Sequence, residues 1–108
     1  MLSRMWILET ADEADADRVI FRLAPGVIKT VGRAPRADFI IDRAMVSRLH
    51  CRLSATEPGL EVVDLDSTNG TFVNGQRVTR AMLKAGDRLR VGRVELTVSR
   101  AEKAGADK

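Results

Sequence analysis

Two Asn-Gly pairs, Asn69-Gly70 and Asn74-Gly75, begin five residues apart and constrain the fold more than any other feature of the chain. Asn-Gly is the strongest short-range signal for a β-hairpin, because both residues tolerate the positive φ of a type I′ turn. The short run Thr71-Phe72-Val73 separates the two pairs. The spacing therefore predicts one very short strand with a hairpin turn at each end.

Short apolar or alternating runs, bounded by turn residues, continue this pattern along the whole chain, and no segment shows helical periodicity. About ten short strands of this kind predict an all-β sandwich. The predicted strands cover residues 5–9, 19–23, 27–31, 38–42, 49–54, 60–65, 71–73, 76–78, 88–91 and 94–98.

The remaining segments are predicted to be turns and loops. Ala24-Pro25-Gly26 is a turn, because proline presets one φ and glycine supplies a positive one. Residues 10–17 and 82–87 are predicted loops, the second ending at a Gly-Asp corner. We expect one domain over residues 1–100 and a flexible tail over residues 101–108.

Composition excludes several classes of protein. A chain of 108 residues with 44% apolar and 31% charged residues is typical of a globular domain. A single cysteine and a single histidine exclude a disulfide framework and a Cys/His zinc cluster, so we expect no metal or cofactor. Cys51 lies in an apolar alternation and is predicted to be a buried, inert thiol. Without a membrane-spanning run or signal-peptide core, the predicted location is the cytoplasm.

The basic residues suggest an anionic partner. The net charge is only +3, but 14 of the 18 basic residues are arginine, whose fork matches carboxylates and phosphates. Aromatic residues make up 4% of the chain, which disfavours a surface that stacks single-stranded nucleic acid. The arginine- and alanine-rich composition is typical of a high-GC bacterium.

Catalysis finds little support in the sequence. The chain has no Gly-Lys-Ser/Thr phosphate loop, no Gly-x-Ser-x-Gly elbow and no His-Glu-x-x-His motif. Ser47 and His50 could form a triad with an aspartate, but their closeness in sequence explains the pair equally well. We therefore expect a protein that is not an enzyme.

Four short polar motifs, each weak by itself, occur in an order that resembles the forkhead-associated (FHA) domain, a phosphothreonine-peptide binding module. The resemblance runs from about Val19 to Val98, and Leu83-x-x-Gly86-Asp87-x-Leu89-x-x-Gly92 matches the closing strands of the family. The four motifs are Gly32-Arg33, Ser47-Arg48-x-His50, Ser67-Thr68-Asn69-Gly70 and Asn74-Gly75.

The resemblance implies an eleven-stranded sandwich of two twisted antiparallel sheets, with the binding loops gathered at one end. It implies that Arg33 and Arg48 contact the phosphate. Ser47 would donate its hydroxyl to the phosphate, and its backbone amide is a second candidate donor. Thr68 and Asn69 would hold the main chain of the peptide.

The same resemblance assigns supporting roles to the other motif residues. His50 would brace the binding loops by hydrogen bonding, which agrees with the usual role of a single buried histidine. Gly32, Gly70 and Gly75 would shape the backbone, and Asn74 would brace a neighbouring loop.

Met45 marks a departure from many family members, which carry a basic residue two positions before the serine and prefer an acidic residue three places after the phosphothreonine. Methionine at this position instead implies an apolar or undemanding preference. Nearby Arg43 or Arg80 could compensate for the missing charge.

The implied partner is a phosphothreonine-containing protein or peptide, in trans or in the same polypeptide, within Ser/Thr-kinase signalling or assembly. One alternative is a phosphate-independent protein–protein or self-association module, whose binding would survive alanine at Arg33 or Ser47. A second alternative is nucleic-acid binding, which would give steeply salt-dependent retention on DNA.

Overall fold

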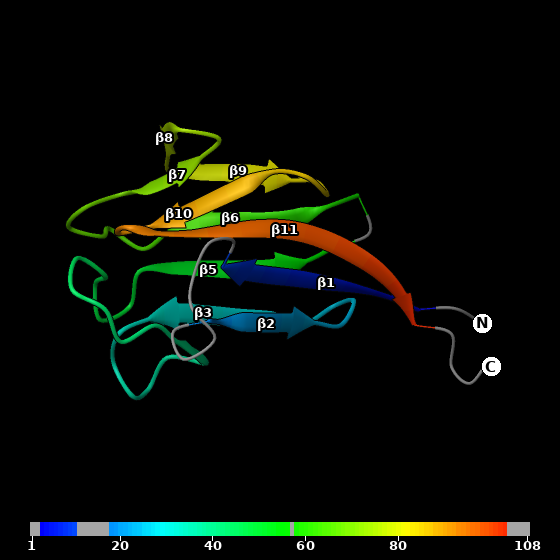
Figure 1. Ribbon diagram of the computed structural model, residues 1–108, viewed down its shortest axis with the longest axis horizontal. Coiled ribbons are helices and arrows are strands. Elements are labelled where there is room, and N and C mark those ends of the chain that lie inside the picture. The colour runs from blue at the N-terminus through cyan, green and yellow to red at the C-terminus, as the bar shows by residue number, and fades with distance from the viewer. Residues whose placement is uncertain (1–2, 11–17, 57, 104–108) are drawn as a thin grey trace.

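The computed structural model describes residues 3–10, 18–56 and 58–103, and this part of the chain contains eleven strands and no helix. The strands form two sheets that pack face to face (Figure 1). None of the described residues belongs to a helix that could cross a membrane. The strands are β1 (Ser3–Thr10), β2 (Ile20–Leu23), β3 (Ile28–Gly32), β4 (Phe39–Ile40), β5 (Cys51–Ala55), β6 (Leu60–Asp64), β7 (Thr71–Val73), β8 (Gln76–Val78), β9 (Arg80–Leu83), β10 (Arg88–Val91) and β11 (Val94–Lys103).

One sheet has six strands in the order β2-β1-β11-β10-β7-β8, and the other has five in the order β4-β3-β5-β6-β9. The predicted sandwich of two sheets is confirmed. All neighbouring strands are antiparallel except β3 and β4, which pair in parallel with Val31 opposite Phe39. The described sheets are otherwise antiparallel as predicted, and this parallel pair lies at an edge where β4 contributes only two residues.

The core lies between the sheets and follows the period-two alternation of the strands. In β5, Cys51, Leu53 and Ala55 are buried, while the intervening side chains are only partly buried. Leu8 and Leu96 close the core from the six-stranded sheet, both with no exposed surface. Each fully buried side chain of this size contributes about 1.5–3 kcal/mol. The edge strands β2 and β4 meet through Phe21 and Phe39, whose rings stack with centroids 4.3 Å apart.

Several predicted boundaries are wrong. Residues 82–87 were expected to form a loop, yet Met82 and Leu83 belong to β9, where Leu83 is fully buried opposite Leu60. β11 continues to Lys103 because its residues 96–103 pair with the whole length of β1. Residues 101–103 therefore belong to a strand and not to the expected tail. The loop predicted over residues 10–17 is wrong at Thr10, which ends β1, and its residues 11–17 lie outside the described residues, as do the tail residues 104–108.

The two Asn-Gly pairs have different structures. Asn74 (φ 50°) and Gly75 (φ 86°) join β7 to β8 and confirm the predicted hairpin. The hairpin predicted at Asn69-Gly70 is wrong, because β6 and β7 belong to different sheets. The connection over residues 65–70 crosses between the sheets, with positive φ at Asp66 and Gly70 but not at Asn69.

Candidate functional site

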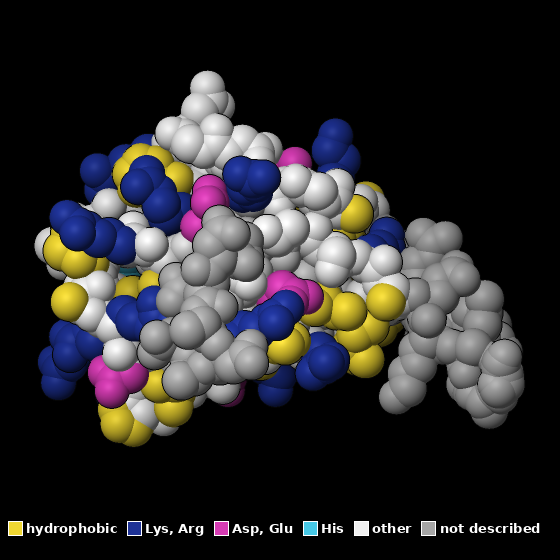
Figure 2. Space-filling model, viewed as in Figure 1, with side chains coloured by type: hydrophobic (Ala, Val, Ile, Leu, Met, Phe, Trp, Pro, Cys, Tyr) yellow, Lys and Arg dark blue, Asp and Glu magenta, His cyan; other side chains and the backbone are white. Residues whose placement is uncertain are grey.

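Three connections that are far apart in the sequence meet at one end of the sandwich, on the left of Figure 1. They follow β3, precede β5 and precede β7, and they enclose a cavity of about 750 Å³. Lys and Arg side chains gather at this end of the molecule (Figure 2). Every residue predicted to touch a ligand lines this one cavity: Arg33, Met45, Ser47, Arg48, Thr68 and Asn69.

Arg33 directly follows β3 and is exposed, but its position is fixed at two points. Its backbone amide donates to the carbonyl of Ser47 at 2.9 Å, and its Nε donates to the carbonyl of Val46 at 3.0 Å. Among the described residues, no partner bonds its two terminal amino groups. The guanidinium is therefore oriented by the protein while its two terminal amino groups remain available to an anion.

Ser47 joins the loop before β5 to the loop before β7. Its Oγ accepts a hydrogen bond from the backbone amide of Thr68 at 2.9 Å, which leaves the hydroxyl hydrogen to be donated elsewhere. Its own backbone amide donates to Nδ1 of His50 at 3.0 Å. In this structure the amide is thus occupied by a buried imidazole, and the hydroxyl is the donor of Ser47 that remains available.

His50 has no exposed surface and also connects the loop before β5 to the loop before β7. Because Nδ1 accepts from an amide, the ring hydrogen must reside on Nε2, which donates to the carbonyl of Gly70 at 2.8 Å. Both ring nitrogens are thus occupied, and neither bonds the hydroxyl of Ser47. The pair cannot work as a nucleophile and its base in this arrangement.

Asp64, at the end of β6, organises the loop over residues 65–70. Its carboxylate accepts bonds from the amide of Ser67 at 3.1 Å, the hydroxyl of Ser67 at 2.5 Å and the hydroxyl of Thr71 at 2.7 Å. Partial burial opposes the charge, but these hydrogen bonds outweigh it and lower the pKa of Asp64. The Ser67 hydroxyl in turn accepts the amide of Gly70 at 3.0 Å.

The sequence interpretation missed Asp64. A signal was present, since an aspartate three residues before a serine is a pattern in which the side chain caps the following turn. Cys51, by contrast, is buried as predicted. Burial and, to a smaller extent, the charge of Asp64 raise the pKa of its thiol to about 12.

Asn69 and Met45 both line the cavity and are joined by a hydrogen bond. Nδ2 of Asn69 donates to the Met45 carbonyl at 3.0 Å, so one amide hydrogen is used and one hydrogen and Oδ1 remain. Met45 has a positive φ of 77° and its side chain is 43% exposed. Its carbonyl lies against Gly92, where an added Cβ would come within 2.6 Å.

Gly32 allows the end of β3 to approach the loop before β5. A Cβ at this position would lie 2.0 Å from the carbonyl oxygen of Arg48, so no larger residue fits without moving the backbone. The amide of Ala34 donates to that same carbonyl at 3.1 Å. This close approach brings Arg33 and Arg48 to the same cavity.

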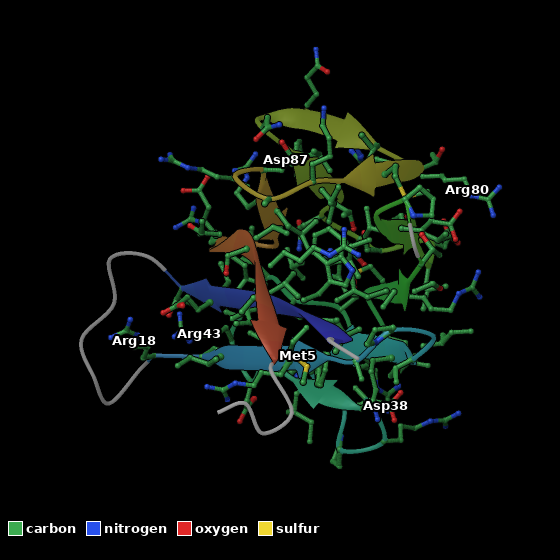
Figure 3. The ribbon with its side chains drawn as sticks, turned by 90° about the vertical axis from the view of Figure 1, so that its right-hand side faces the viewer. Met5, Arg18, Asp38, Arg43, Arg80 and Asp87 are labelled. Carbon is green, nitrogen blue, oxygen red and sulfur yellow. The ribbon has the colours of Figure 1, made fainter. Side chains whose placement is uncertain are left out.

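Asn74 and Gly75 are not brought to the cavity. Asn74 follows β7, whereas the loop over residues 65–70 precedes it, and a three-residue strand separates them by roughly 10 Å. Nδ2 of Asn74 donates to Asp87 at 3.2 Å, and Oδ1 accepts the amide of Arg88 at 2.9 Å. Asn74 therefore stabilises the turn between β9 and β10, near Asp87 in Figure 3, and does not contact the loop before β7.

The two arginines proposed to compensate for Met45 lie in different places. Arg43 lines the cavity beside Met45. Arg80 lies on β9, where its Nε is 2.9 Å from a carboxylate oxygen of Glu61, and Figure 3 places it on the side of the molecule opposite Arg43. Arg80 does not line the cavity.

The fold and the cavity define a β-sandwich binding domain with its site on loops. The sequence matches the family model described as FHA domain over residues 29–92, and the chain belongs to this family. It is similar to an ABC transporter ATP-binding/permease protein of Mycobacterium tuberculosis (42% identity, 73% of this chain and 9% of the relative). It is also similar to the glycogen accumulation regulator GarA of M. tuberculosis (36% identity, 74% of this chain and 49% of the relative). The chain thus spans less than half the length of these curated relatives.

Solved structures resemble the whole described sandwich. A chain from a study of phosphothreonine-dependent FHA domain interactions is 31% identical with a TM-score of 0.73, covering 90% of this chain and 95% of the other. The FhaA FHA domain, solved in complex with the intracellular domain of Rv3910, is 31% identical with a TM-score of 0.72, covering 89% and 99%.

Proposed function

We propose that this domain binds phosphothreonine-containing segments of proteins and that it catalyses no reaction. The observation that carries the proposal is the convergence of Arg33, Ser47, Arg48, Thr68 and Asn69 on one cavity, on loops fixed by internal hydrogen bonds. Family membership and a solved relative studied for phosphothreonine-dependent interactions support the same function.

In this proposal the phosphate lies against Arg33, Ser47 and Arg48. Phosphothreonine carries about −1.5 to −2 charges and three strong acceptor oxygens. Two guanidinium groups and one hydroxyl offer matching donors, and charge-assisted bonds are roughly twice as strong as neutral ones. Because Nε of Arg33 is already bonded to the Val46 carbonyl, little side-chain entropy is lost when its terminal amino groups bind the phosphate.

The peptide main chain would be held by Thr68 and Asn69. One amide hydrogen and Oδ1 of Asn69 remain after its bond to Met45, which suits one donor and one acceptor of an extended peptide. Thr68 is exposed and fixed through its amide to Ser47, so its side chain is free to contact the ligand.

Specificity beside the phosphothreonine would come from Met45 and Arg43, which line the same cavity. The exposed side chain of Met45 favours an apolar residue three places after the phosphothreonine. We assign no such role to Arg80. A cytoplasmic place of action is part of the proposal, since curated relatives are named as regulators of glycogen accumulation and inhibitors of oxoglutarate dehydrogenase.

The test is calorimetric titration of the domain with matched phosphothreonine, phosphoserine and unphosphorylated peptides from a library. Arg33→Ala should weaken phosphothreonine binding by about 2–5 kcal/mol, roughly 30-fold or more. Arg22→Ala, at an exposed arginine on β2, is the matched control and should leave the affinity unchanged. Equal binding of all three peptides, or binding that survives both Arg33→Ala and Ser47→Ala, would contradict the proposal and favour phosphate-independent recognition.

A further inference from the structure

A second cavity of about 660 Å³ adjoins the first at the end of β3. The two cavities share Arg33, Arg48 and Leu49. The second, here called the Arg36 cavity, is completed by the turn that follows Arg33, and its remaining lining residues are Ala34, Pro35 and Arg36.

The two cavities differ in charge. The phosphothreonine cavity includes the carboxylates of Asp42 and Asp66 in its lining, which balance part of its positive charge. The Arg36 cavity is lined by three arginines and by no acidic residue. The nearest acid in its own loop, Asp38, bonds the amide and hydroxyl of Thr30 at 2.9 and 3.1 Å (Asp38 is labelled in Figure 3).

The loop that carries Arg36 is held in place before any ligand arrives. The amide of Ala37 donates to the carbonyl of Ala34 at 3.0 Å, which closes a turn with Pro35 at its second position. Ala37 is 5% exposed, and the amide of Ala34 bonds the carbonyl of Arg48. Arg36 therefore lies at the tip of an ordered turn. Its side chain is exposed and has no partner within the described part of the chain.

We propose that the Arg36 cavity binds a second anionic side chain of the same phosphothreonine peptide. This inference rests on the proposed function, because the shared residues place the second anion next to the phosphothreonine phosphate. The chemistry required is an oxyanion with at least two acceptor oxygens, which a phosphorylated residue or a Glu or Asp can supply to a guanidinium fork. Since an extended peptide advances about 3.3 Å per residue, the second anion falls within roughly three residues of the phosphothreonine.

The proposal is tested by titrating the domain with peptides that contain one phosphothreonine and, at each position from three before to three after it, phosphoserine, glutamate or alanine. We expect one or two positions at which phosphoserine tightens binding by about 3- to 10-fold over alanine, since exposed ion pairs contribute modestly. A smaller gain in affinity with glutamate at the same position would identify a site that prefers phosphate. An equal gain would identify a site that accepts any carboxylate or phosphate.

Arg36→Ala should abolish this gain and change the affinity for the singly phosphorylated peptide by less than about twofold. The control Arg22→Ala should keep the gain in affinity. Both variants should have the melting temperature of the wild type, because the replaced side chains are exposed. Absence of a gain at every position, or a gain that persists in Arg36→Ala, overturns the inference and leaves the proposed function intact. If the singly phosphorylated peptide does not bind at all, the proposed function fails, and the inference fails with it.

Discussion

Replacing Asp64 by alanine should disorder the loop that carries Thr68 and Asn69, although Asp64 does not line the cavity. The carboxylate is the acceptor for two buried hydroxyls, those of Ser67 at 7% exposure and of Thr71 with no exposed surface. Alanine offers neither hydroxyl a partner, and it also releases the amide of Ser67.

The size of the effect follows from these lost bonds. A buried donor without a partner costs about 1–3 kcal/mol, and part of this is recovered where water can enter beside the half-buried carboxylate. We therefore expect Asp64→Ala to lower the free energy of unfolding by about 2–4 kcal/mol. For a domain of this size, such a change lowers the melting temperature by roughly 10–20 °C.

Chemical denaturation and calorimetric titration with a phosphothreonine peptide measure the two consequences. Ser67→Ala alone and combined with Asp64→Ala completes a double-mutant cycle, in which we expect a coupling free energy of about 1 kcal/mol or more. Glu95→Ala, at an exposed carboxylate on β11, is the control and should change stability by less than about 0.5 kcal/mol. A loss below about 0.5 kcal/mol in Asp64→Ala, with unchanged peptide affinity, would refute the reasoning.

The same carboxylate predicts an acid dependence of stability. The pKa of folded Asp64 is lowered by the hydrogen bonds of Ser67 and Thr71 against the opposing effect of burial, so it lies below the value of about 3.9 in the unfolded chain. Its stabilisation is then present above about pH 4 and is lost as the pH falls through the folded pKa. As the pH falls below about 4, the stability of the wild type should fall more steeply than that of Asp64→Asn.

Three further substitutions separate binding from folding. Asn69→Ala should weaken peptide binding at least about 5-fold with little loss of stability. Asn74→Ala should cost about 1–2 kcal/mol of stability and leave the peptide affinity unchanged. The reverse result, with affinity measured by titration and stability by denaturation, would place the site elsewhere. Gly32→Ala should lower the free energy of unfolding by about 3 kcal/mol or more, because the added Cβ meets a backbone carbonyl. In Gly26→Ala the added Cβ meets no atom, so the loss should be only about 1–2 kcal/mol, from the positive φ. Equal melting temperatures of the two variants would contradict this. His50→Ala should reduce both stability, by about 2–4 kcal/mol, and peptide affinity, and unchanged affinity in a folded variant would show that His50 does not position Ser47.

The strands were predictable where the alternation of apolar residues is long enough to show a period of two. β5 and β10 follow directly from such runs. The prediction failed at β9, because the four residues Arg80–Leu83 are too few to distinguish an edge strand from a loop. The partner strand β6 decides that Leu83 is buried, and β6 is distant in sequence.

The hairpin predicted at Asn69-Gly70 failed for a similar reason. The Asn-Gly pair favours a reversal of the backbone, but it does not determine which strands pair on either side of that reversal. Here β7 pairs with β10 and β8, so the preceding loop must cross from one sheet to the other. The motif that looks like a corner between two paired strands is a link between the two layers of the sandwich.

The candidate ligand residues could be identified from their order in the sequence, but the groups that hold them could not. Arg33, Ser47 and Asn69 are exposed or half-buried polar residues in loops, where a role in binding is the natural interpretation. His50 bonds the carbonyl of Gly70, twenty residues away, and Asp64 bonds the hydroxyl of Thr71 in a strand of the other sheet, and both contacts require the packed sheets. Hydrogen bonds of this kind depend on tertiary structure, whereas the three-residue spacings from Asp64 to Ser67 and from Ser47 to His50 are visible in the sequence.

The hydrogen bonds of these buried groups explain how loops without regular structure can present a ligand site. Apolar packing contributes little to the loop over residues 65–70, so its order must come from polar contacts that exclude water. The Nε2 hydrogen of His50 and the carboxylate of Asp64 supply such contacts, to Gly70 and to Ser67 respectively. If the loop were mobile in the free domain, ordering each residue would cost about 1–2 kcal/mol of the binding free energy. Because the protein orders the loop itself, the phosphate and main-chain contacts that we propose can contribute to affinity nearly in full.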